Sequence, residues 1–271
     1  MEKIYLTEDK IASLEPIVFP RLENDHTWSN HSKPALVIVP GGSYNYCSVR
    51  EAYPVAYTFL QKGYQCFILN YHVGEESEYP RPIMDLALAV KHLRHKHKEY
   101  GIARDDINVI GFSAGGHLAG LYSSLYGNQD FLDLLDMKPD DSKIKATILG
   151  YPAINLEYVY EDVRVNNYYD KVGKLFRTYA KEKDGLALVN ENTSPTFIFH
   201  TLDDELVDVQ GVLKYSERLI EKGVKTEFHL FSEGKHGLST SDDLSNYGRD
   251  YPERINSWVD LSLKFLESLR R

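Results

Sequence analysis

The sequence has no long hydrophobic run. No stretch approaches the roughly 18 consecutive apolar residues that a membrane-spanning helix needs, so such a helix is excluded. The first ten residues, MEKIYLTEDK, are charged and contain no apolar segment. We therefore expect no signal peptide and a cytoplasmic location.

Cysteine and positive charge are both scarce. The only cysteines are Cys47 and Cys66, whose spacing fits no metal site, so we expect two free thiols. The 31 basic residues are outnumbered by 40 acidic ones, which gives a net charge of −9. A chain with this balance is not expected to bind nucleic acid or an anionic membrane surface.

The remaining composition is typical of a folded globular chain. Of 271 residues, 42% are hydrophobic and 26% are charged, which argues against disorder. This length fits one α/β domain covering residues 1–271.

Short apolar segments alternate with segments of helical pattern. Because each expected strand is almost entirely apolar, the sheet should be mostly parallel, with helices covering both of its faces. The first 30 residues should add one or two antiparallel edge strands. The expected strands are 35–39, 65–70, 107–110, 145–149, 196–200 and 225–231, and the expected helices are 82–100, 117–126, 209–223 and one that begins near residue 252.

One segment interrupts this alternation. Residues 155–194, between two expected strands, are rich in Tyr, Asp, Glu and Lys. An insert of this length forms either a small cap over a site or a loosely packed helical excursion, and we favour the cap.

The strongest chemical signal is the pattern G-x-S-x-G at residues 111–115. It follows an expected strand and opens an expected helix, which is the context that a nucleophile elbow requires. The two glycines leave room for a sharp turn, and the start of the helix favours developing negative charge near the serine. Ser113 is therefore the candidate nucleophile.

A nucleophilic serine needs a base, which is most often histidine. Three histidines follow Ser113 in the chain. His200 and His229 lie within expected strands, where packing explains them. His236 lies in the glycine-flanked loop GKHGL after the last expected strand, and it is the candidate base.

The acid that orients the base should lie at the end of a strand between these two residues, because the chain order in this fold is serine, acid, histidine. The segment after strand 196–200 offers Asp203, Asp204 and Glu205. Adjacent carboxylates leave a turn in different directions, and residue chemistry alone does not choose between them.

With these residues in place, the chain resembles the bacterial acetyl-esterase branch of the α/β-hydrolases, near hormone-sensitive lipase and often grouped with acetyl-xylan and other carbohydrate esterases. The matching segments span residues 35–238 in the order PGGSY, NYHV, YPRPIMDLALAVKHLR, GFSAGGHLAG, SPTFIFHTLDDELV and GKHGL. The resemblance implies ester hydrolysis through an acyl-enzyme, without cofactor or metal. Its spacing H-x-x-x-D-x-x-V favours Asp204 as the acid.

The resemblance also implies an oxyanion hole. Its donors would be the N–H groups of Ala114, Gly42 and Ser43. The best-known version of this loop has histidine where this chain has Pro40 and a third glycine where it has Ser43. Pro40 lacks an N–H but precedes the donors, at a strand end where losing a ladder hydrogen bond is tolerable. We predict that the loop donors and the Ala114 N–H point to one spot about 3 Å away.

Other side chains are weaker candidates. Tyr44 and Tyr46 share the glycine loop and His72 ends a strand, so all three are candidates for substrate contact. His117, just after the elbow, should be structural. His92, His95 and His97 could suggest a metal site, but their cationic neighbours argue against one, and we expect no metal.

The favoured hypothesis is a serine carboxylesterase acting on short acyl esters, such as acetyl groups on sugars or xylan fragments. One alternative is a serine peptidase of the prolyl-oligopeptidase type, although the large additional domain of those peptidases is missing. Another is a non-catalytic binding protein on a hydrolase fold. The expected partner is a small-molecule ester, and a homo-oligomer stays open.

Overall fold

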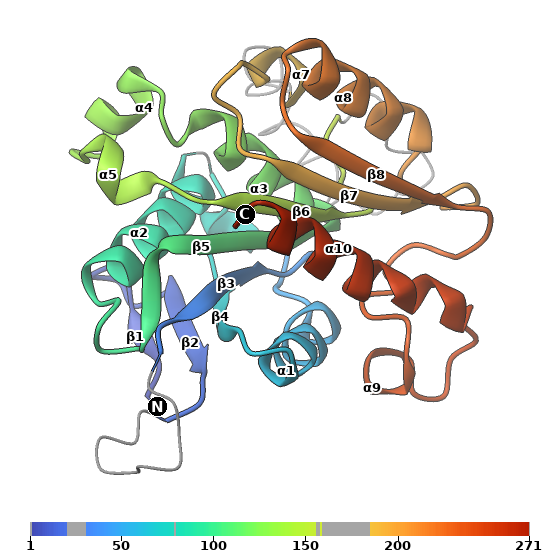
Figure 1. The fold of residues 1–271 in the computed structure, drawn as a ribbon, viewed down its shortest axis with the longest axis horizontal. Coiled ribbons are helices and arrows are strands. Elements are labelled where there is room, and N and C mark those ends of the chain that lie inside the picture. Colours follow the sequence, from blue (N-terminus) through green and yellow to red (C-terminus); the bar gives the residue numbers. More distant parts are fainter. Residues whose placement is uncertain (1, 21–30, 79, 156–157, 159–184, 271) are drawn as a thin grey trace.

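The computed structural model describes residues 2–20, 31–78, 80–155, 158 and 185–270. Within these residues, eight strands form one sheet in the order β1-β2-β4-β3-β5-β6-β7-β8, with helices on both faces (Figure 1). The strands from β4 to β8 in this order are parallel, and β2 pairs antiparallel with β4 and β1. The antiparallel strands come from the first part of the chain, as the sequence predicts.

Most element bounds are close to the predicted ones, but β5 begins at Ile102, five residues before the predicted start at residue 107. The strands are β1 (Ile4–Tyr5), β2 (Ser13–Ile17), β3 (Lys33–Val39), β4 (Gln65–Asn70), β5 (Ile102–Phe112), β6 (Ala146–Gly150), β7 (Thr196–Thr201) and β8 (Thr226–Phe231). The longer helices are α1 (Tyr53–Gln61), α2 (Arg81–His95), α3 (Ser113–Leu125), α8 (Val209–Glu221) and α10 (Ser257–Ser268). The shorter ones are η1 (Val49–Glu51), η2 (Gly74–Glu76), α4 (Gln129–Leu134), α5 (Pro139–Ser142), α7 (Gly185–Leu188), α9 (Asp243–Asn246) and η5 (Glu253–Asn256).

Strand β3 shows why the sheet needs two helical layers. Successive side chains of a strand point to opposite faces. Ala35, Val37 and Val39 belong to one buried cluster, and Leu36 and Ile38 belong to the other. A strand that is apolar on both faces has to be covered twice, so helices lie above and below the sheet.

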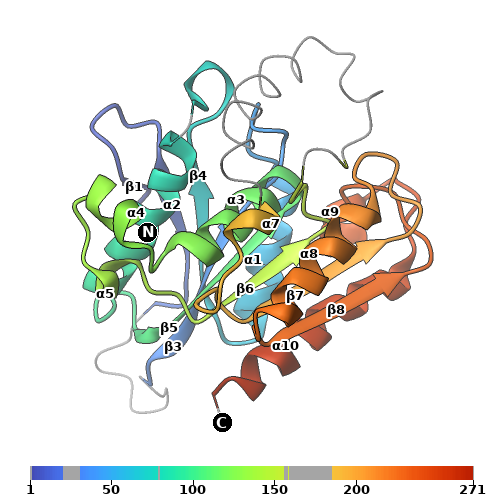
Figure 2. The same cartoon turned by 90° about the horizontal axis from the view of Figure 1, so that it is seen from above.

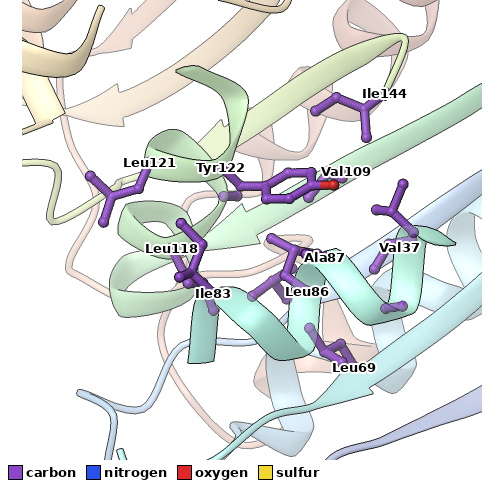
Figure 3. Close-up of a cluster of buried hydrophobic side chains, with 14 of the residues drawn as sticks. Val37, Leu69, Ile83, Leu86, Ala87, Val109, Leu118, Leu121, Tyr122 and Ile144 are labelled. Carbon is purple, nitrogen blue, oxygen red and sulfur yellow. The ribbon is translucent and has the colours of Figure 1, made fainter. Parts of the chain in front are cut away.

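The first cluster lies between the sheet and α2, α3 and α8. Figure 3 shows part of it, with Ile83 of α2 close to Leu118 of α3, and with Val37 and Val109 of the strands in the same cluster. The second cluster lies against α1 and α10 on the opposite face (Figures 1 and 2). There Trp258 stacks on Phe199, with ring centroids 4.6 Å apart.

The order of the strands places a topological switch point at β3. From β3 the chain crosses to β4 on one side, and from β4 it crosses to β5 on the other side of β3. The carboxyl ends of β3 and β5 are thus neighbours at a switch point of the topology, where open α/β sheets bind ligands. The glycine loop follows β3 and the elbow follows β5, so the fold brings the two motifs together.

One helix boundary differs from the prediction. Helix α2 ends at His95 and not near Tyr100. The next residues form turns, in which His97 Nδ1 lies 3.0 Å from the carbonyl oxygen of Arg94. The imidazole of His97 thus contacts a carbonyl oxygen of the last helical turn. Such a contact favours the end of the helix at this point, earlier than the sequence pattern suggested.

Other expectations fall on different parts of the chain. Most of the segment predicted as a cap, residues 155–194, lies outside the described residues, which resume at α7. Cys47 and Cys66 are free thiols, as predicted. Among the helices of the described part, none is both long and apolar enough to cross a bilayer.

Candidate active site

Ser113 lies at the sharp turn between β5 and α3. Its φ angle is +52°, in the left-handed region that few side-chain-bearing residues adopt. A Cβ atom at Gly111 would lie 2.2 Å from the carbonyl oxygen of Gly115, and one at Gly115 would lie 2.1 Å from that of Val39. The turn is therefore tight enough that both positions need glycine, as the elbow pattern predicts.

Ser113, His236 and Asp204, from distant parts of the sequence, are joined by a continuous chain of hydrogen bonds, called below the hydrogen-bond row. Ser113 Oγ lies 2.8 Å from Nε2 of His236, and Nδ1 of His236 lies 2.7 Å from Oδ2 of Asp204. Asp204 follows β7, and His236 lies in the loop after β8. The fold thus brings together the serine, histidine and one of the carboxylates that the sequence singled out.

The Asp204 carboxylate is almost completely buried and fully hydrogen-bonded. Its Oδ1 accepts the N–H groups of Leu206 and Val207, both at 2.9 Å. Burial by itself raises the pKa of Asp204, but the hydrogen bond and charge of His236 outweigh burial and hold that pKa below its usual value. By contrast, Asp203 and Glu205 are exposed to solvent.

The other two histidines that follow Ser113, His200 and His229, are not hydrogen-bonded to the serine. His200 is buried at the end of β7, where burial lowers its pKa, and its Nε2 is 3.9 Å from Asp204 Oδ2. His229 on β8 lies 2.6 Å from Glu227 Oε1. Both are strand residues with structural contacts, in line with the sequence-based interpretation.

The glycine loop after β3 is held in place by hydrogen bonds to the backbone groups of Gly41. The Gly41 N–H donates to Glu51 Oε2 at 2.9 Å, and the Gly41 carbonyl accepts the Ser48 N–H at 2.9 Å. Gly42 has a φ of +124°, and Ser43 has a φ of +56°. Ser43 therefore adopts a backbone conformation that glycine would adopt more easily.

Pro40 causes no break in this loop. Its carbonyl oxygen accepts the Tyr71 hydroxyl at 2.8 Å, which anchors the end of β3 to the segment after β4. The missing N–H of Pro40 lies before the glycines, where the backbone leaves the sheet.

Two backbone N–H groups beside Ser113 are available for an anion. Ala114 lies in the first turn of α3, whose N–H groups have no acceptor within the helix. Among the described residues, the Gly42 N–H has no hydrogen-bond acceptor. A Cβ atom at Gly41 would lie 2.9 Å from Ser113 Cβ, so the loop directly borders the serine.

Two of the three residues predicted to contact substrate have their side chains committed to the fold. The Tyr44 ring is 5% exposed, and its hydroxyl lies 2.9 Å from Nδ1 of His117. His117 is structural as expected, and burial lowers its pKa to about 3. His72 is buried between Asp85 and Asp9, at 2.8 and 3.0 Å.

The buried, hydrogen-bonded side chains of Tyr44 and His72 argue against a direct contact with substrate, and a substrate-contact role for either residue stays a prediction. Tyr46 in the same loop is 59% exposed and stays a candidate. At the end of α2, His95 pairs with Asp141 at 2.7 Å. In the described part of the chain, no group of three or more His, Cys, Asp or Glu side chains is arranged to hold a metal ion.

The sequence interpretation missed a buried pair next to the site. Glu51 of η1 accepts the hydroxyl of Tyr151 at 2.8 Å, and the Tyr151 ring lies edge-on to His236 with centroids 4.9 Å apart. Tyr151 directly follows β6, at the carboxyl end of a central strand, and that position was the available signal.

Comparison with known proteins places the chain in a family. The family model described as BD-FAE matches residues 26–219. The chain is 28% identical over 237 residues to endo-1,4-beta-xylanase B of Butyrivibrio fibrisolvens, which covers 84% of this chain and 35% of that protein. It is also 28% identical over 216 residues to an acetylxylan esterase of Xylanibacter ruminicola, covering 77% of this chain and 42% of that protein. The chain thus spans less than half the length of these curated relatives.

Solved structures match over nearly their whole length. A carboxylesterase of Lactobacillus plantarum superposes with a TM-score of 0.84 at 25% identity, covering 94% of this chain and 92% of that one. An acetyl ester-xyloside bifunctional hydrolase of Caldicellulosiruptor lactoaceticus gives a TM-score of 0.77 at 27% identity, covering 99% and 96%. The predicted α/β-hydrolase fold is confirmed, and the chain belongs to the BD-FAE family of α/β-hydrolases.

Proposed function

We propose that this protein is a serine carboxylesterase that hydrolyses short acyl esters. Ser113 is the nucleophile, His236 the general base, and Asp204 the residue that orients the base. The observation that carries the proposal is the continuous hydrogen-bond row from Ser113 Oγ through both ring nitrogens of His236 to Asp204. This row joins the three residue types of a serine-hydrolase triad in the order that their roles require.

The reaction proceeds in two halves. In the first, Ser113 Oγ attacks the ester carbonyl carbon while its proton passes to His236 Nε2, and the imidazolium then gives that proton to the leaving alcohol. In the second, His236 takes a proton from water, which attacks the acyl-enzyme, and returns that proton to Ser113 Oγ as the carboxylic acid leaves. Asp204 accepts the Nδ1–H of His236 throughout, which fixes the tautomer and stabilises the imidazolium.

The negative charge that develops on the carbonyl oxygen needs donors. We assign this role to the N–H groups of Ala114 and of the loop at Gly42 and Ser43, which border the nucleophile. Loss of one such donor costs about 3–4 kcal/mol of barrier. Neither half of this reaction requires a cofactor or a metal ion.

The substrate that we propose is a short-chain ester, acetyl above all, carried on a sugar or a xylan fragment. Two relatives support this choice through their names, an acetylxylan esterase and an acetyl ester-xyloside bifunctional hydrolase. Tyr46 offers an exposed ring beside the loop, and aromatic faces are suited to contact sugar rings. We expect a cytoplasmic protein whose partner is this small-molecule ester.

The proposal is tested by hydrolysis of p-nitrophenyl acetate and p-nitrophenyl octanoate. We expect faster turnover of the acetate, labelling of Ser113 by a fluorophosphonate probe, and loss of roughly 10⁶-fold in kcat in Ser113→Ala. Acetate release from acetylated xylo-oligosaccharides then tests the sugar substrate. Equal labelling of wild type and Ser113→Ala would overturn the nucleophile assignment, and preference for octanoate would overturn the acetyl assignment.

A further inference from the structure

Glu51 is a buried carboxylate whose two oxygens serve different parts of the site. It lies in η1 and is 5% exposed. Its Oε2 accepts the N–H of Gly41, in the glycine loop, at 2.9 Å. Its Oε1 accepts the hydroxyl of Tyr151, at the end of β6, at 2.8 Å. A buried carboxylate is costly unless it is fully hydrogen-bonded, so this side chain holds its partners firmly.

Tyr151 continues the connection to the histidine. Its hydroxyl donates to Glu51 and accepts the N–H of Ser239, three residues after His236, at 2.9 Å. The ring lies edge-on to the His236 ring at an interplanar angle of 68°. Burial, reinforced by the charge of Glu51, holds the pKa of Tyr151 well above its ordinary range. The hydroxyl therefore stays protonated and remains a donor to Glu51.

Arg50, the residue before Glu51, is hydrogen-bonded to the loop that carries His236. Arg50 donates from Nη2 to the carbonyl oxygen of Gly237 at 2.9 Å and from Nε to that of Ser245 at 2.7 Å. In return, the Ser239 hydroxyl donates to the Arg50 carbonyl oxygen at 2.7 Å. Two consecutive residues of η1 thus contact both the glycine loop and the loop that carries His236.

We propose that Glu51 is a positioning residue that sets the glycine loop and His236 at their working distance around Ser113. Through Gly41 it fixes the loop that carries the Gly42 and Ser43 N–H groups, and through Tyr151 it fixes the backbone and ring next to His236. This inference rests on the proposed esterase function. Donors and base act on the same tetrahedral intermediate, so a single rigid link between them preserves the geometry in which both work.

The variant Glu51→Gln tests this role. It keeps the shape of the side chain but replaces one acceptor oxygen with an NH₂ donor, so the new side chain can accept from Gly41 or from Tyr151 but not from both. With the concentration of active sites titrated by a fluorophosphonate, we expect kcat on p-nitrophenyl acetate to fall about 10- to 100-fold. KM should stay within about threefold, because the lost interaction acts on the transition state.

Glu15→Gln is the matched control. Glu15 on β2 also accepts a tyrosine hydroxyl, that of Tyr53, at 2.9 Å, but it has no contact with the triad. We expect its kcat to equal that of wild type. A Glu51→Gln protein with wild-type kcat per titrated site would overturn the inference, whatever its melting temperature, because Glu51 would then serve the fold alone.

Tyr151→Phe provides an independent variant if Glu51→Gln does not fold. It leaves the Gly41–Glu51 hydrogen bond intact and removes both the donor to Glu51 and the acceptor for Ser239. We expect a loss of kcat here too, and a double variant whose loss is smaller than the product of the single losses, because both act on one link. Unchanged kcat in Tyr151→Phe overturns the inference. Absence of turnover and labelling in the wild type would instead refute the esterase function itself.

Discussion

The Nδ1 atom of His236 lies 2.7 Å from Oδ2 of Asp204, while Asp203, one residue earlier in the chain, is exposed to solvent. The second oxygen of Asp204 accepts two backbone N–H groups, so the carboxylate is fixed in one orientation. A histidine that donates from Nδ1 to this carboxylate presents the lone pair of Nε2 to Ser113.

The first prediction follows from this pair. Asp204→Asn places an NH₂ donor or a neutral oxygen opposite His236 Nδ1 and permits the wrong tautomer, so kcat should fall about 10⁴-fold. Asp203→Asn is the matched control and should change kcat by less than about threefold, because its side chain faces solvent. Both are measured with p-nitrophenyl acetate. A large loss in Asp203→Asn with a small one in Asp204→Asn would reverse the assignment.

Local pattern predicted the parts of the site that are continuous in sequence. The elbow at Ser113 and the loop of His236 are short motifs, and each contains the glycines that its tight turn needs. The choice between Asp203 and Asp204 depends on the direction in which each side chain leaves the turn after β7. Spacing by itself does not encode that direction.

The residues that support the site were missed for a related reason. Glu51 and Tyr151 are separated by 100 residues, and they meet because the sheet order β3-β5-β6 brings the segment after β3 close to the end of β6. Tyr44 and His72 were assigned to substrate because they neighbour the motifs, but their side chains turn inward to His117 and Asp85. Proximity in sequence therefore indicated where the backbone lies but not the direction in which these side chains point.

The central strands β3, β4, β6 and β7 were predictable because they are buried on both faces over most of their length. The end of α2 was not, since the polar segment after His95 supports helix and turn equally well by composition. Two local contacts accompany its end, namely that of His97 Nδ1 with the Arg94 carbonyl and the turn in which the Ile102 N–H donates to the His97 carbonyl at the start of β5.

The second prediction concerns the contact between the elbow and the glycine loop. A Cβ atom in Gly115→Ala would lie 2.1 Å from the carbonyl oxygen of Val39 and 2.4 Å from that of Pro40. These are backbone atoms, so either α3 or the loop has to move. We expect a loss of about 1–3 kcal/mol in the free energy of unfolding, measured in urea. Because the moved loop carries the oxyanion donors, kcat should also fall at least about tenfold.

Gly127→Ala is the control for that substitution. It follows the same helix α3, and its added Cβ would meet open space. Its stability should stay within about 0.5 kcal/mol of wild type, with unchanged kcat. Equal stability of the two variants would contradict the close packing between α3 and the loop.

The third prediction concerns Ser43, whose φ of +56° is costly for a side-chain-bearing residue. Ser43→Gly should retain kcat within a few-fold and leave the free energy of unfolding equal or higher by up to about 1 kcal/mol. Ser43→Val should lower both, because a β-branched residue is poorly tolerated at positive φ. Ser48→Val is the control in the same loop, where φ is −69° and valine meets no such strain. If both valine variants behaved alike, backbone strain at Ser43 would not be the cause.

The fourth prediction concerns His72, which lies between the carboxylates of Asp85 and Asp9. Burial opposes protonation of His72, but the hydrogen bonds and charges of both carboxylates outweigh burial and raise its pKa. Because the folded pKa lies above the unfolded one, the stabilisation is fully present below about pH 6.5 and is lost as pH rises through the folded pKa. The ion pairs of His72 with Asp9 and Asp85 are therefore most stabilising in mild acid.

Asp9→Asn tests this dependence. Asn keeps the oxygen that accepts the Thr7 hydroxyl and the Ile11 N–H, but it can place an NH₂ group opposite Nε2 of His72. In mild acid two donors then face each other, whereas at alkaline pH the neutral ring can accept from that NH₂ group. The drop in melting temperature relative to wild type should therefore be larger at about pH 6 than at about pH 9. Thr7→Val, which removes the neighbouring hydrogen bond to Asp9 without touching His72, should give the same drop at both values. An equal drop for Asp9→Asn at both would mean that His72 is not protonated in the folded protein.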